Sequence, residues 1–346
     1  MSAPVPARRT CAALAAGLAA GLLLAGCHAA VQVQRGSFQM PQATQRPTPV
    51  MPAPDQPSGP EAHSGTAGQD ADSLRALTNE DRTYGRVGLL TQPTILYSVY
   101  LNEENGAEWD AEGVARTQNY LSLADAWLCE QAARYGADDV TLYYGGELMT
   151  AETVDHRFNG EDEGSDFHAR LDDLCARLDT PELHRAYGTD RVGFLFFLPV
   201  SGSSYTMPHY VEDGPWYCSE YCLLYAYDCY SDAKDYEGPA VYAHEILHLF
   251  GAPDLYEGSA DYYVTRELVD YVETTWPDAI MNYTYNEDGT VDYDCIRKQL
   301  CPVTAYRIGL CDSFAGLERF PALRELSAGV YSDGPDTAFG GGSHAA

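Results

Sequence analysis

The chain has 346 residues and carries 21 Lys and Arg against 51 Asp and Glu, a formal net charge of -30. Such a polyanion is excluded as a general binder of nucleic acid, because phosphate backbones require basic side chains to displace their counterions, and anionic lipid headgroups would repel it. Hydrophobic residues make up 45% of the chain, enough for a core, so disorder over the full length is also excluded.

The first 26 residues have the pattern of an export signal. Arg8 and Arg9 precede an apolar run, Cys11 to Ala25, that is too short for a comfortable membrane span. The end of this run, Leu24-Ala25-Gly26-Cys27, resembles the bacterial lipobox, in which the cysteine is lipidated and the chain is cut just before it. We therefore expect an extracytoplasmic, cell-surface bacterial lipoprotein that is anchored to the membrane through Cys27; an ordinary signal peptide with an incidental cysteine is the alternative.

Composition divides the rest of the chain. Residues 27–78 are rich in Pro, Gln, Ser, Thr and Gly and are typical of a disordered tether that holds a domain away from the membrane. Residues 327–346 are similarly poor in apolar side chains, which indicates a flexible tail. Residues 79–326 remain as a single folded domain, which we expect to be a monomer.

Cysteine usage agrees with export. Besides Cys11 and Cys27, the chain has eight cysteines, at positions 129, 175, 218, 222, 229, 295, 301 and 311. An even number in an exported domain predicts up to four disulfides, but the sequence does not choose among the possible pairings.

Two specific roles for cysteines can be considered. Cys129 and Cys175 lie in two predicted helices and either join them or pack as small hydrophobic residues. A thiolate zinc site built from Cys218, Cys222 and Cys229 is a rival to disulfides, but this spacing lacks the paired short knuckles of structural zinc sites.

The hydrophobic pattern predicts alternating strands and helices. Strands are expected at 95–101, 140–144, 192–200 and 221–230, and helices at 110–135, 167–178 and 302–310. The run at 192–200 is almost continuously apolar, which favours a central strand covered on both faces. This order of elements predicts an α/β (α+β) fold with a mixed sheet.

The segment from Gly238 to Asp254 contains a short helix with metal-binding side chains. His244 and His248 are four residues apart, on one face of the helix, where two imidazoles can bind one metal ion. Glu245 lies beside the first ligand, where it can take a proton from metal-bound water. Gly251 permits a sharp turn that would bring Asp254 back as a third ligand.

The pattern His244-Glu245-x-x-His248-x-x-Gly251-x-x-Asp254 resembles the zinc-binding consensus of the metzincin metallopeptidases, in the variant of snapalysin-type secreted bacterial proteases that has Asp as third ligand. Downstream, Asp278-Ala279-Ile280-Met281-Asn282-Tyr283 is similar to the metzincin Met-turn. The resemblance implies that Met281 lies beneath the metal. It also implies that Tyr283, two residues later, ligates the metal or stabilises the oxyanion.

The resemblance further implies a metzincin-like zincin fold, with a mixed twisted sheet, an edge strand over the active-site helix and a mostly helical C-terminal subdomain. In a gluzincin-like site the third ligand would come from a downstream helix, and Glu267 or Glu273 could serve in place of Asp254. We favour Asp254, because the short return after Gly251 is difficult to explain otherwise.

We therefore predict a zinc-dependent endopeptidase that hydrolyses extracellular proteins, with one catalytic Zn²⁺ and Glu245 as general base. The substrate would add as a strand beside the segment 221–230. Two alternatives are a non-catalytic surface lipoprotein, an adhesin or binding module with a structural zinc site, and a zinc hydrolase of non-peptide amides. Two acidic segments, 161–166 and 286–289, could contribute to calcium sites, although a loop and a hairpin turn explain them better.

Overall fold

The computed structural model describes residues 87–161, 163–207, 220–229, 235–259, 261 and 263–325. The predicted signal peptide, lipidation site at Cys27, tether and tail therefore lie outside the described residues. None of the helices in the described ranges is both long and apolar enough to cross a bilayer.

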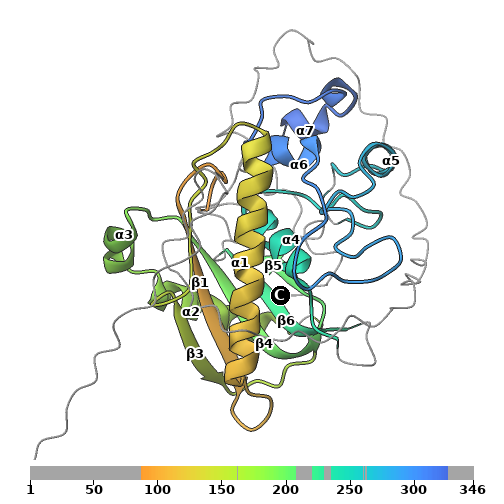
Figure 1. Cartoon of the computed structure of the whole chain (residues 1–346). Helices are drawn as coiled ribbons and strands as arrows, with labels where there is room; N and C mark the ends of the chain where they lie inside the picture. The colour runs from red at the N-terminus through yellow and green to blue at the C-terminus, as the bar shows by residue number, and fades with distance from the viewer. Residues whose placement is uncertain are drawn as a thin grey trace, which may run out of the picture.

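A six-stranded mixed sheet forms the centre of the molecule (Figure 1). Its order is β2-β1-β4-β6-β5, and β3 pairs with β1 beyond the end of β2. All neighbouring strands are parallel except β5, which is antiparallel to β6. The strands are β1 (Thr94–Glu103), β2 (Leu142–Tyr143), β3 (Met149–Val154), β4 (Val192–Gly202), β5 (Tyr205–Met207) and β6 (Tyr221–Asp228).

Helices cover both faces of this sheet. The helices before the C-terminal part are α1 (Ala111–Arg134), α2 (Ser165–Leu178), α3 (Pro181–Tyr187) and α4 (Pro239–Leu249). Alternate residues of β4 divide between the two faces: Leu195 and Phe197 pack with α1 and α4, whereas Phe194 and Phe196 pack with α2. The alternation of side chains along a strand, which predicted the strands, therefore also places successive residues in the two hydrophobic cores on opposite faces of the sheet.

The long helix α1 is fixed at both of its ends by local chemistry. Asp110 is its N-cap, and the Asp110 carboxylate accepts a hydrogen bond of 2.7 Å from the backbone N–H of Gly113. Gly136, directly after the C-cap, has φ +83°, a left-handed conformation that favours glycine. These are the boundaries that the sequence pattern predicted.

The predicted α/β arrangement with a mixed sheet is confirmed, and the central position of the strand at 192–200 is confirmed as β4. Strand β2 is shorter than predicted, and β3, β5, α3 and α5 (Arg266–Thr275) were not expected from the pattern. The first three are short, so their periodicity is weak, whereas α5 buries Leu268, Val269 and Val272 on one face, a helical spacing that the sequence does carry.

The prediction that 221–230 forms the exposed edge was wrong. That segment is β6, which lies between β4 and β5. Seven of its eight residues are apolar or aromatic and all but one of the eight are buried, which is the environment of an interior strand. Within the described part of the chain, the sheet ends at β5 instead.

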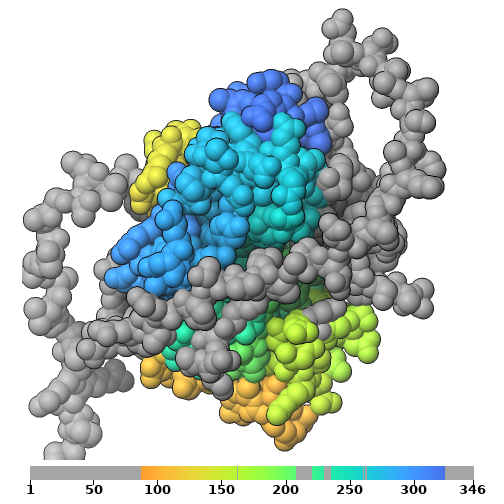
Figure 2. All heavy atoms as spheres, turned by 90° about the vertical axis from the view of Figure 1, so that its right-hand side faces the viewer, coloured from red at the N-terminus to blue at the C-terminus, as the bar shows by residue number. Residues whose placement is uncertain are grey.

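The segment after α4 is less helical than the resemblance implied. It contains α5, α6 (Pro302–Arg307), a 3₁₀ turn at Leu317–Arg319 and α7 (Ala322–Glu325), separated by irregular chain. Gly289 and Gly309 have φ of +76° and +82°, so turns interrupt the helices there. In Figure 2 this C-terminal part, in blue, fills one half of the molecule and the strands and α2 lie in the other half.

A bond between Cys129 and Cys175 is not formed. Cys129 is disulfide-bonded, but Cys175 is a thiol packed with Phe167 and Leu171 on the α2 side of the sheet. Cys129 belongs to the core on the α1 side, so the sheet separates the two residues. The other described cysteines, at 222, 229, 295, 301 and 311, are also thiols. Among the described cysteines, Cys129 is therefore the one in a disulfide, which lies within the expected upper limit of four bridges.

One buried carboxyl group of α1 makes stability depend on pH. Asp125 is 7% exposed, and burial raises its pKa to about 6, although a hydrogen bond from Tyr144 opposes this shift. A carboxyl group whose pKa is higher in the folded state favours folding when protonated, and this contribution is lost as pH rises from about 4 to above 6.

We predict that Asp125→Asn removes this dependence. The stability of the variant relative to the wild type should rise by on the order of 3 kcal/mol between pH 4 and pH 7, because Asn cannot acquire the buried charge. Urea denaturation at a series of pH values measures this difference. The same substitution at the exposed Asp138 is the control, and a relative stability of Asp125→Asn that does not change with pH would contradict the prediction.

Candidate metal centre

Helix α4 and the turn after it bring three potential ligands together. The helix starts with Pro239 at its first position, where the missing N–H is not needed. It ends in a Schellman motif: the Gly251 N–H donates to the His248 carbonyl (2.9 Å) and the Ala252 N–H donates to the Leu247 carbonyl (3.1 Å). Gly251 has φ +86°, as this motif requires. The turn reverses the chain, so Asp254 returns over the helix.

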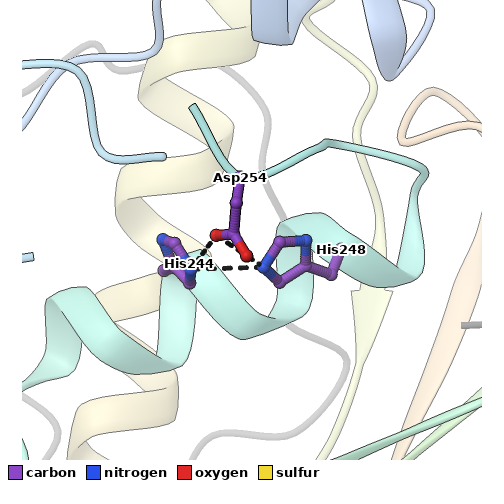
Figure 3. Close-up of side chains that lie close together, drawn as sticks. All are labelled: His244, His248 and Asp254. Carbon is purple, nitrogen blue, oxygen red and sulfur yellow. Dashed lines mark hydrogen bonds and ion pairs between the residues drawn. The ribbon is translucent and has the colours of Figure 1, made fainter. Parts of the chain in front are cut away.

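The donor atoms of His244, His248 and Asp254 converge on one point (Figure 3). The two imidazole Nε2 atoms are 3.2 Å apart. Asp254 Oδ1 lies 3.1 Å from Nε2 of His244 and 3.3 Å from Nε2 of His248. For a tetrahedral zinc ion with bonds of about 2.0–2.1 Å, neighbouring ligand atoms are about 3.3–3.4 Å apart. The three spacings therefore fit such an ion with little adjustment.

The other ring nitrogens fix the tautomers of both histidines. His244 Nδ1 is 3.0 Å from the Ile280 carbonyl, and His248 Nδ1 is 2.7 Å from the Ala252 carbonyl. A carbonyl can only accept, so each Nδ1 carries a proton and each ring turns its Nε2 towards the other donor atoms, where it can bind either a proton or a metal ion. Asp254 Oδ1 is buried, and the polar atoms described beside it are the two imidazole Nε2 atoms. Three acceptors facing one another in this way are the arrangement that a cation stabilises.

In the metal-free protein, the short distance between Asp254 and the two imidazoles favours binding of a proton at this site. Burial lowers the pKa of His248, but the Asp254 carboxylate outweighs burial and holds this pKa well above its usual value. Burial would raise the pKa of Asp254, but the two imidazoles hold it well below its usual range. The site therefore binds positive charge strongly, either as a proton shared with Asp254 or as a metal ion.

Glu245 lies beside this centre without belonging to it. Its Oε1 is 4.0 Å from His244 Nε2, and the residue is only 5% exposed. Thr206 of β5 lies 2.8 Å from the other carboxylate oxygen, Oε2. A carboxylate that is close to the metal ligands but not among them can exchange protons with a water molecule at the centre.

The Met-turn segment packs against the centre. Ile280 receives the His244 hydrogen bond, and the next residue, Met281, is fully buried and accepts a hydrogen bond of 2.8 Å at its carbonyl from the Leu255 N–H. The chain from His244 to Leu255, which carries the three potential ligands, is thus hydrogen-bonded to this segment at both of its ends. Met281 is thus a buried residue of the segment that contacts His244, and its place beneath a metal ion stays a prediction.

The tyrosine that contacts a potential ligand is Tyr256, and not Tyr283 as the resemblance implied. The Tyr283 hydroxyl donates to Glu273 Oε1 (3.3 Å) on α5, so the described contacts do not bring it to the metal ligands. The Tyr256 hydroxyl donates instead to Asp254 Oδ2 (2.9 Å). This carboxylate therefore presents Oδ1 to the imidazoles while Oδ2 is held. Among 26 tyrosines, the spacing Asp254-x-Tyr256 alone gave no signal that could have singled out Tyr256.

The alternative third ligands lie elsewhere. Glu267 is exposed and pairs with Arg319 at 3.0 Å, and Glu273 is engaged by Tyr283. Among the described residues, Asp254 is the acid grouped with the two histidines.

The thiolate alternative also finds no support. Cys222 is fully buried in β6, and burial raises the pKa of its thiol well above the usual value, so it is not a thiolate. Neither Cys222 nor Cys229 belongs to a metal-binding group of described residues, and Cys218 lies outside them.

The acidic segments considered for calcium have structural roles. Glu163 is buried and accepts hydrogen bonds from Tyr225 (2.7 Å) and from backbone N–H groups of its own loop, and its Oε2 lies 2.9 Å from His156 Nε2. Segment 286–289 forms a turn closed by a bond from Gly289 N–H to the Asn286 carbonyl (2.9 Å).

A second group of possible ligands, Asp292, Asp294 and Cys295, is partly exposed, and Arg297 already lies 3.4 Å from Asp292. Exposed acidic groups of this kind are common without an ion, so we assign no calcium site.

Comparison with known proteins gives no further guidance. No protein-family model matches the chain, and no curated protein matches it significantly. The metzincin assignment therefore remains a prediction that rests on the motif and on the geometry described above.

We predict that Asp254→Asn lowers zinc affinity by at least about 100-fold, because it replaces an anionic ligand with a neutral amide. Glu273→Gln, the matched change at the rejected ligand, should leave affinity within about twofold. Competition with a chromophoric chelator measures both. Equal losses in the two variants would show that Asp254 is not the distinguishing ligand.

Zinc binding should also release a proton. The raised pKa of His248 keeps the metal-free site protonated at pH 7, and zinc must displace that proton. Affinity should therefore increase roughly tenfold per pH unit over the range in which His248 is protonated. Calorimetric titration with zinc in buffers of different ionisation enthalpy should give about one proton per ion; a heat independent of the buffer is the opposite outcome.

Proposed function

We propose that this protein is a zinc-dependent endopeptidase of the metzincin type that cleaves extracellular proteins. The observation that carries the proposal is the convergence of two imidazole nitrogens and one carboxylate oxygen, spaced 3.1 to 3.3 Å apart, with a second carboxylate beside them. Three protein ligands leave a fourth position open, which is typical of catalytic rather than structural zinc sites.

The chemistry divides between the metal and Glu245. When bound, zinc would polarise the substrate carbonyl and make a water molecule more acidic. Glu245, with Oε1 facing the ligands, takes the proton from the attacking water and passes it to the leaving amine. The low exposure of Glu245 limits competing contact with bulk water.

The edge strand β5 is the candidate binding surface for the substrate. It replaces the segment 221–230 in this role, because β6 is paired on both sides. β5 packs on α4, and Thr206 lies at hydrogen-bond distance from Glu245, so a peptide paired with β5 would pass beside the general base. Backbone pairing at a sheet edge binds extended peptides without requiring a particular sequence.

The arrangement of the sheet also supports the metzincin type. The resemblance implied an edge strand over the active-site helix, and β5 is an edge strand that packs on α4. The Ile280 carbonyl of the segment 278–283 contacts His244, which supports the assignment of this segment as a Met-turn. Export and anchoring through Cys27 belong to the same proposal and rest on the sequence.

The non-catalytic alternative is disfavoured by Glu245. A structural zinc site gains nothing from a buried carboxylate 4.0 Å from a ligand nitrogen, because burying a charge costs free energy. A hydrolase of non-peptide amides would use the same centre, and the edge strand favours the peptide.

We predict that Glu245→Gln reduces hydrolysis of casein by about 10²- to 10⁴-fold while one zinc ion per chain is retained, because the amide cannot act as a base. Turnover and zinc content measure the two effects. Glu257→Gln changes an exposed residue of the same charge and should retain wild-type turnover. Chelator should abolish the wild-type activity and added zinc should restore it; full activity of Glu245→Gln would refute the mechanism.

A further inference from the structure

The two carboxylate oxygens of Glu245 have different surroundings. Oε1 faces the metal ligands, 4.0 Å from His244 Nε2. Oε2 points away from them and lies 2.8 Å from the hydroxyl of Thr206. Of the two oxygens, Oε1 is therefore the one that faces the metal centre, where Glu245 would take a proton from water.

Thr206 reaches Glu245 from the edge of the sheet. It lies in β5 directly opposite Cys222 of β6, and its Oγ1 is 3.2 Å from Cys222 Sγ and 2.9 Å from the Glu245 carbonyl. Cys222 Sγ is itself 3.4 Å from that carbonyl. Two strands and the helix thus meet around one glutamate.

The donors in this cluster can be assigned by counting protons. A threonine hydroxyl has one proton, and a carboxylate is a stronger acceptor than a backbone carbonyl. The Thr206 proton therefore goes to Oε2, and the Cys222 S–H is available to the Glu245 carbonyl. With this assignment Thr206 fixes the rotation of the carboxylate and keeps Oε1 turned towards the metal ligands.

We propose that Thr206 is a positioning residue for Glu245, and that it connects the strand that binds substrate to the group that transfers the proton. The proposal rests on the proposed peptidase function. Without the hydroxyl, the carboxylate loses its one described side-chain hydrogen bond and can rotate or draw in water at Oε2. Displacement of a catalytic group by about 1 Å is enough to cost roughly 10²-fold in rate.

The test compares two substitutions of the same residue. Thr206→Val keeps the shape but removes the hydroxyl, and Thr206→Ser keeps the hydroxyl. Thr206→Val should lower kcat by about 10- to 100-fold with KM within about twofold, and Thr206→Ser should stay within about threefold of the wild type. Thr189→Val makes the same change at a threonine outside the site, whose hydroxyl donates to the Pro93 carbonyl, and should leave kcat unchanged.

A binding measurement separates positioning from loss of the metal. Acetohydroxamate is a small chelating probe that presents a hydroxyl group to a carboxylate beside the metal. Its affinity, measured by calorimetry, should fall about tenfold in Thr206→Val, whereas zinc affinity in chelator competition should not change. If Thr206→Val does not fold, as judged by circular dichroism, Thr206→Ala is compared with Thr206→Ser in the same assays.

The outcomes are distinguishable. Wild-type kcat in Thr206→Val, or an equal loss in Thr206→Ser, overturns the role of Thr206 while leaving the peptidase function intact. A parallel loss of zinc affinity would show that Thr206 merely supports the fold of the centre, and also overturns it. A wild-type protein that binds zinc but cleaves no protein substrate refutes the peptidase function, and the role of Thr206 with it.

Discussion

The convergence of three potential ligand atoms on one point is the constraint on which the site depends. His244, His248 and Asp254 turn these atoms towards one another, and the hydrogen bonds on the far sides of both rings prevent the rings from turning away. The site therefore favours positive charge at this point, as a proton or a metal ion, and the surrounding elements hold the three side chains in place. The sheet supports α4, the Schellman turn returns Asp254, and the segment around Met281 holds His244 from below.

Much of the site could be predicted because its chemistry is local in sequence. Two ligands are one helical turn apart, and the third follows a glycine that only a left-handed turn explains. The same applies to α1, whose N-cap and terminal glycine are explicit, and to β4, whose unbroken apolar run required cover on both faces. Patterns of this kind can be read from the sequence because neighbouring residues alone determine the helix, turn or strand in which they lie.

What could not be predicted depends on contacts between distant segments. β5 has only three residues, and its pairing with β6 is set by tertiary structure, so the edge was assigned to the wrong strand. Thr206 is an ordinary threonine until β5 lies against α4, and Tyr256 becomes significant only when the turn places it on Asp254. The choice between the two roles considered for Cys129 and Cys175 depends on such contacts as well: the helices that carry them pack on opposite faces of the sheet, and Cys175 packs as a small hydrophobic residue.

The hydrogen bond between His244 and the Ile280 carbonyl spans 36 positions of the chain. The ribosome therefore synthesises the three potential ligands before it reaches Ile280, whose carbonyl orients His244. During synthesis, the chain would thus carry the complete motif while its first imidazole could still rotate. A copy truncated before Ile280 would contain all three potential ligands but lack the contact that orients His244.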